Sequence, residues 1–169
     1  MSIITTAQYI LEDLQTAIEQ LSDEQFASPN SLINASVGQH SRHIIEFFQC
    51  LEEQAPEGSI CYDLRQRKTE IETSTQAASL AIDGILAWLQ TEPQEQSLQL
   101  LVDHSLAKEE QEKSPIQSSL HREIAFNVEH AIHHMAIFKI SLKYAYPNIE
   151  LAETFGLAPS TYRHQQRQS

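Results

Sequence analysis

Apolar residues recur every three to four positions in four stretches of the chain. This spacing puts them on one face of an α-helix. It predicts helices over about residues 3–21, 36–55, 74–90 and 119–146. Residues 22–34 predict a connection with room for one short helical turn, and Pro159 is suited to start a final short helix.

The pattern changes between Pro93 and Pro115. The stretch SLQLLVDHSL alternates in part between apolar and polar residues, and the charged run KEEQEKS follows it. Such alternation is typical of strands, so a small hairpin or a long ordered loop is expected here. The sequence therefore predicts an all-α fold, an antiparallel four-helix bundle in one domain over residues 1–169, with this excursion between the third and fourth helices.

Composition narrows the classes of partner. The chain has 23 acidic against 11 basic residues, a net charge of -12 and only four glycines. Few glycines disfavour all-β and doubly wound folds, and the negative charge repels phosphate backbones and anionic lipids. No nucleic-acid or membrane partner is expected. Two cysteines, Cys50 and Cys61, fit free thiols, with Cys50 in the core, and the absence of a signal or spanning segment predicts a cytoplasmic protein.

Histidines occupy inward positions on two of the predicted helices. On a helical wheel, His40 and His43 share the apolar face of the second helix. On the fourth helix, His130 and His134 lie in a polar seam between two apolar arcs, whereas His133 lies outside it. An i,i+4 pair of histidines can reach one divalent ion, and a third histidine would complete a face that leaves a position open for water or substrate.

An alternative is that these are core histidines without a metal. Asn127, Glu123, Ser141 and backbone carbonyls would then supply their hydrogen bonds. We favour the metal, because two inward-facing clusters satisfied independently would be the costlier coincidence. A zincin site fits worse, since Ala131 stands where the HExxH motif needs glutamate.

Four segments carry a family resemblance: SVGQHSRHIIEFF, YDLRQR, EHAIHHMAIFKI and FGLAPSTYRH. Together they resemble the DinB-like (YfiT-type) superfamily of metal-dependent enzymes over essentially the whole chain. The resemblance implies an up-down-down-up four-helix bundle, often a homodimer, with a metal ion held by three histidines. Carried onto this sequence, the metal ligands fall on His43, His130 and His134. His40 departs from the commonest pattern and could replace His43 or support the ligands from behind.

Similar members of that superfamily include thiol S-transferases, thiol-dependent isomerases and proteins described as hydrolases. The leading hypothesis is an enzyme in which a divalent ion, Zn or Ni, activates water or a low-molecular-weight thiol to attack a small-molecule electrophile. His40, Glu123 and Asn127 are the candidate catalytic residues that would orient this nucleophile or move its proton. The alternative is a non-catalytic metal-binding or interaction protein on the same fold.

The segment YDLRQR allows two interpretations. Asp63 could pair with Arg65 or Arg67 and pin the loop, or these residues and Tyr62 could contact substrate. We expect the mouth of the site to be lined by residues 62–67, residues 98–104 and the C-terminal tail.

Overall fold

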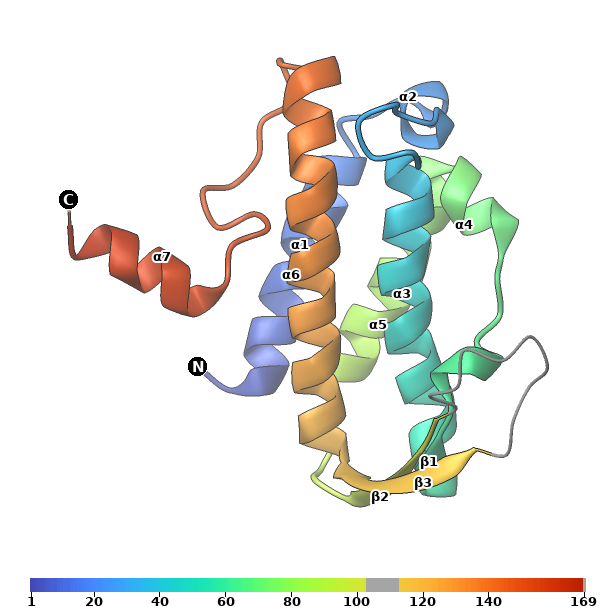
Figure 1. Ribbon diagram of the computed structural model, residues 1–169. Coiled ribbons are helices and arrows are strands. Elements are labelled where there is room, and N and C mark those ends of the chain that lie inside the picture. Colours follow the sequence, from blue (N-terminus) through green and yellow to red (C-terminus); the bar gives the residue numbers. More distant parts are fainter. Residues whose placement is uncertain (103–112, 169) are drawn as a thin grey trace.

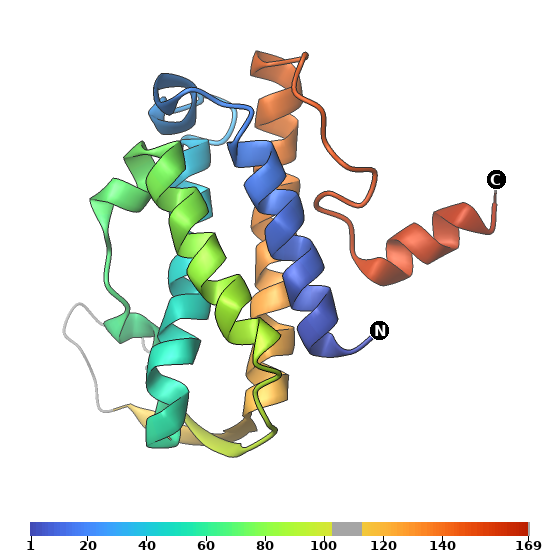
Figure 2. The same ribbon diagram turned by 180° about the vertical axis from the view of Figure 1, so that it is seen from behind.

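Four long helices lie side by side in the computed structural model, which describes residues 1–102 and 113–168 (Figure 1). They are α1 (Ile3–Ile18), α3 (Val37–Gln54), α5 (Thr75–Gln90) and α6 (Leu120–Ala145). Helix α6 packs against α1 and α3, and α5 packs against the same two helices from the other side (Figure 2). All four helices end within three residues of the positions that the apolar spacing predicts.

Shorter helices complete the described part of the chain. Helix α2 (Asp23–Ala27) is the predicted short turn of helix, whereas α4 (Thr69–Thr73) was not predicted. Helix α7 (Pro159–Gln166) stands away from the four long helices and has no buried residue. Two 3₁₀ turns, η1 (Ala55–Glu57) and η2 (Tyr62–Leu64), follow α3.

The start of α3 is fixed by a capping box. The Ser36 hydroxyl accepts the backbone N–H of Gln39, and the Gln39 side chain accepts the backbone N–H of Ser36, at 3.0 Å each. This arrangement satisfies two backbone donors that the first turn of a helix leaves open. It also fixes the phase of α3, and therefore the direction in which the histidines of its first two turns point.

The prediction of an all-α four-helix bundle is wrong, because the chain also forms a three-stranded mixed sheet. Strand β2 (Ser97–Val102) pairs in parallel with β1 (Ser59–Ile60) and antiparallel with β3 (Ser114–Ser119), which makes this an α/β fold. Ser59 lies opposite Gln99. Of the two alternatives expected between Pro93 and Pro115, the chain forms the hairpin: β2 falls within the alternating stretch, whereas β3 lies mostly beyond Pro115, where no strand was predicted. Strand β1 escaped prediction because two residues show no period and its partner is distant along the chain.

Apolar side chains between the long helices form the core. Large side chains such as Phe48 and Phe138 are fully buried, and each contributes about 1.5–3 kcal/mol to stability. Cys50 and Cys61 are buried free thiols, and burial raises the pKa of the Cys50 thiol to about 12. The prediction that Cys50 is a core residue is confirmed. None of the helices within the described ranges is long and apolar enough to cross a membrane.

Candidate metal centre

Histidines from α3 and α6 meet where these two helices pack together. His43, His130 and His134 each offer one ring nitrogen, and the three nitrogens lie within 4.8 Å of one another. The ring centroid of His134 is 4.6 Å from that of His43 and 4.6 Å from that of His130. This three-histidine group could hold a metal ion.

The spacing of the nitrogens fits a divalent ion. His43 Nε2 lies 2.8 Å from His130 Nε2. Nitrogens bound tetrahedrally to zinc at about 2.0–2.1 Å are about 3.3 Å apart, so the two rings need to separate by about half an ångström. Imidazole is a good ligand for zinc, copper, iron and nickel. The donor atoms therefore suit several transition metals without a rearrangement of the helices.

The electrostatic surroundings keep the imidazoles neutral. Burial, followed by the neighbouring His130 and Arg65, lowers the pKa of His43 to about 4. Burial and the adjacent histidines lower the pKa of His134 to about 3, and burial also lowers the pKa values of His130 and His40. A metal binds the neutral imidazole, so this site holds its ligands ready near neutral pH.

His40 lies directly behind one member of the group. Its Nδ1 is 2.8 Å from Nδ1 of His134, so Nε2 is the ring nitrogen of His134 that stays available for an ion. A metal-bound histidine usually donates its other ring N–H to a fixed partner, and His40 is placed to be that acceptor. His133 is exposed, in agreement with its predicted position outside the seam.

A pocket opens beside the histidines. Its volume is about 200 Å³, and it is lined by Ala35, Gln39, His40, Arg42, His43 and His134. Helix α3 therefore supplies most of its wall. The expected mouth is wrong for this pocket, because neither residues 62–67, nor the described residues 98–102, nor the C-terminal tail lines it. Asp103 and His104 lie outside the described residues.

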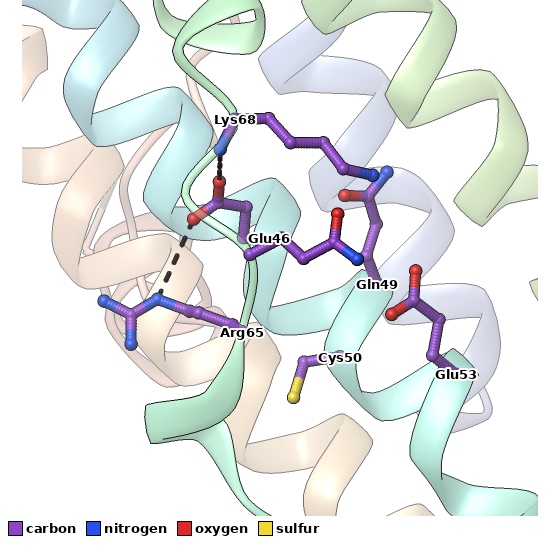
Figure 3. Close-up of a pocket in the computed structure, with 7 residues that line it drawn as sticks. Glu46, Gln49, Cys50, Glu53, Arg65 and Lys68 are labelled. Carbon is purple, nitrogen blue, oxygen red and sulfur yellow. Dashed lines mark hydrogen bonds and ion pairs between the residues drawn. The ribbon is translucent and has the colours of Figure 1, made fainter.

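Arg65 reaches the group from the segment that follows α3. Its Nη2 is 3.5 Å from His43 Nδ1, and its guanidinium lies over the Phe47 ring at 5.0 Å. Its Nε faces Glu46 Oε2 at 3.8 Å, so its ion-pair partner among the described residues is Glu46 and not Asp63, the partner that the sequence suggested (Figure 3).

Glu46 is a member of the site that the sequence analysis missed. It is only 3% exposed, and its Oε1 accepts the backbone N–H of Lys68 at 2.7 Å, which ties the segment carrying Arg65 to α3 (Figure 3). Its place three residues after His43 was the available signal. The cavity next to Glu46 measures about 10 Å³, room for about one water molecule, so it is no substrate site.

The structure places Glu123 in a separate polar cluster further along α6. Its fully buried carboxylate accepts hydrogen bonds from the Tyr62 hydroxyl at 2.9 Å, from Arg122 Nη1 at 2.9 Å and from the Ser118 hydroxyl. Asn127 Nδ2 lies 3.4 Å from the same Tyr62 hydroxyl. The contacts that the described residues make to Glu123 thus come from these side chains and not from a histidine.

An aromatic layer separates this cluster from the histidines. The Phe47 ring stacks on the Tyr62 ring, with the two centroids 4.8 Å apart, and on the His130 ring, with the centroids 4.6 Å apart. Of the three candidate catalytic residues, the structure brings His40 to the three-histidine group, while the side-chain hydrogen bonds that Glu123 and Asn127 make among the described residues go to other groups and not to a histidine.

No family model, curated protein or solved structure matches this chain. What the site can do is therefore inferred from its own residues.

Proposed function

We propose that this chain is a divalent-metal-dependent enzyme of the DinB-like type that its motifs resemble. An ion on His43, His130 and His134 would activate water or a low-molecular-weight thiol to attack a small electrophile, as in a hydrolase or a thiol S-transferase. One observation carries the proposal: three imidazole nitrogens lie within 4.8 Å of one another beside a pocket of about 200 Å³. Three protein ligands leave a coordination position for a further ligand, as in catalytic zinc sites.

The chain's own residues have distinct tasks in this proposal. A zinc or nickel ion, when bound, supplies the charge that lowers the pKa of coordinated water or thiol. His40 accepts the Nδ1–H of His134 and so holds that ring with Nε2 toward the other two histidines. Arg65 and the Phe47 ring pack against His43 and would help to hold its ring in place, with Arg65 Nη2 3.5 Å from His43 Nδ1 and the Phe47 ring centroid 4.7 Å from that of His43.

A second candidate is a non-catalytic metal-binding or interaction protein. It is favoured by the position of His40, whose Nδ1 is only 2.8 Å from a ring nitrogen of His134. A rotation of the two rings that brought His40 onto the ion would fill the open position, and a closed site with four protein ligands is typical of structural metals.

The experiment that separates the two candidates begins with metal-loaded protein. Hydrolysis of p-nitrophenyl acetate, and conjugation of 1-chloro-2,4-dinitrobenzene with 2-mercaptoethanol, are measured before and after chelation. We expect metal-dependent turnover of at least one substrate, its loss in His134→Ala and its retention in His133→Ala. Stoichiometric metal without turnover of either substrate would favour the non-catalytic candidate.

A further inference from the structure

The pocket beside the histidines presents donors and no carboxylate. None of its six lining residues is acidic, although acidic residues outnumber basic ones by 23 to 11 in the chain. Its polar members are the histidines, Gln39 and Arg42. The negative charge of the protein repels anions over most of its surface, but the lining of this pocket carries no negative charge.

The capping box determines which group of the Gln39 side chain is available to a ligand in this pocket. Its side-chain oxygen already accepts the backbone N–H of Ser36 at 3.0 Å, so the amide NH₂ group is the part that remains for a ligand. Gln39 is exposed, and among the described residues no hydrogen bond that holds the fold together uses its NH₂ group. Gln39 therefore offers the pocket hydrogen-bond donors only.

Two arginines flank His43, and the carboxylates near them are already engaged. Arg42 lines the pocket with 21% of its side chain exposed, and its Nη1 is 2.5 Å from Glu72. Arg42 and Arg65 also share Glu46, each at 3.8 Å. Two cations thus face two carboxylates, and the charge of the protein around the group is about balanced.

A divalent ion shifts this balance strongly. Three neutral imidazoles bring no negative charge, so both charges of the ion stay uncompensated, and the charge of a bound ion often dominates its surroundings. The pocket volume of about 200 Å³ is below the ~300–1,000 Å³ of sites for drug-sized ligands, so the group that enters is compact.

We propose that the pocket binds the carboxylate of a small organic acid, held by Arg42 and Gln39 while a second atom of that molecule meets the metal. This inference rests on the proposed function for the presence of the ion. It adds the substrate class: the thiol or the electrophile that the enzyme uses is an anion. Arginine suits this role because its guanidinium is always charged and carries five N–H donors, so that Arg42 can keep its contact with Glu72 and still donate a charge-assisted hydrogen bond to the ligand's carboxylate.

The test compares two thiols of the same shape. Zinc is first titrated into metal-free protein, and the zinc-loaded protein is then titrated calorimetrically with 3-mercaptopropionate and with its neutral amide, 3-mercaptopropionamide. We expect the carboxylate to bind about tenfold more tightly, a difference of about 1.4 kcal/mol. Equal affinities, a preference for the amide, or binding of neither thiol would overturn the inference. Failure of zinc to bind would instead overturn the proposed function on which it rests.

Two variants place the preference in this pocket. Gln39→Glu keeps the capping box, since glutamate serves at this helix position as well as glutamine, but adds a negative charge at the pocket. It should weaken binding of the carboxylate more than binding of the amide, because the added charge repels only the anion, and so reduce the preference. Arg42→Gln should reduce the preference in the same direction, with zinc stoichiometry and thermal unfolding recorded because Arg42 also pairs with Glu72. An unchanged preference in Gln39→Glu would show that the anion binds elsewhere.

Discussion

Two polar clusters lie along α6 and are built in opposite ways. Around Glu123, three donors from different segments converge on one buried carboxylate, so donors and acceptor match. Around His134, imidazoles face imidazoles, with ring nitrogens of His40 and His134 2.8 Å apart. His40 Nε2 is buried without a hydrogen-bond partner among the described residues. A buried polar group is normally satisfied, so the Glu123 carboxylate, with its three donors, needs no ligand, although Asn127 Oδ1 beside it has no partner among the described residues. The imidazoles that face one another around His134 are the group that a metal ion could complete.

The largest expected effect comes from removing a ligand of the three-histidine group. His130→Ala or His134→Ala should weaken zinc affinity by more than about 100-fold, because two imidazoles cannot replace a three-histidine shell. Affinity is measured by competition with a chromogenic chelator. His133→Ala is the matched control, since this neighbouring histidine is exposed and should keep its zinc. Loss of zinc in His133→Ala with retention in His134→Ala would mean that the ligands lie on another face of α6.

A smaller loss is expected when the support behind His134 is removed. His40→Leu deletes the acceptor of the His134 Nδ1–H and should lower zinc affinity about 10 to 100-fold. His40→Asn has the same shape as His40→Leu but restores an oxygen close to the lost Nδ1, so it should recover most of the affinity. If the two variants behave alike, His40 contributes only volume. If His40→Leu abolishes binding, His40 is itself a ligand.

The Glu123 cluster should respond in stability and not in metal binding. Glu123→Gln leaves three donors facing an amide, which should lower the free energy of unfolding by about 1–3 kcal/mol. Zinc affinity should stay within about twofold of the parent protein, because Phe47 separates the two clusters. Urea unfolding and zinc titration of the same sample check both statements. Glu129→Gln, at an exposed position of α6, is the control. A loss of zinc in Glu123→Gln would show that the Glu123 cluster takes part in metal binding, which would contradict the separation of the two clusters.

Burial of the histidines makes the stability of the metal-free protein depend on pH, with little effect near neutral pH. The pKa of His43 is lowered to about 4 and that of His134 to about 3, from an ordinary value of 6.5. The unfolded chain therefore binds more protons below about pH 6.5, and metal-free protein should lose stability steadily as the pH falls from about 6.5 toward 4. Above that range these groups contribute no slope. His134→Leu should flatten the dependence and His133→Ala should not. A flat profile in the parent protein would contradict the burial of these imidazoles.

The sequence predicted the long helices well, because each has a continuous apolar face, and residues such as Ser36 and Ser74 mark where α3 and α5 begin. It could not predict the sheet as a whole. Strand β1 has two residues, and its pairing with β2 depends on where the helices bring those segments. Helix α4 escaped for a related reason: it is short and lies against α3 through Gly38, where a Cβ would meet the Glu72 carbonyl oxygen at 2.0 Å.

At the site, helical phase was enough to bring the histidines together and not enough to assign their neighbours. A wheel gives direction but not distance along the helix, so Glu123 and Asn127 shared the seam with His130 while lying one to two turns below it. Arg65 and Glu46 depend on how the segment after α3 folds back, with Glu46 accepting the N–H of Lys68. No local spacing encodes that return, whereas the i,i+4 spacing of His130 and His134 is local.

The central claim is that His43, His130 and His134 hold one divalent ion. The most direct test is to strip the protein of metal, titrate it with zinc at about pH 7.5, above the reference pKa of histidine, and record X-ray absorption at the zinc edge. The expected result is one ion per chain, with three histidine nitrogens at about 2.0–2.1 Å and water in the remaining coordination position. Absence of stoichiometric binding, or a shell dominated by carboxylate oxygen or cysteine sulfur, would contradict the account.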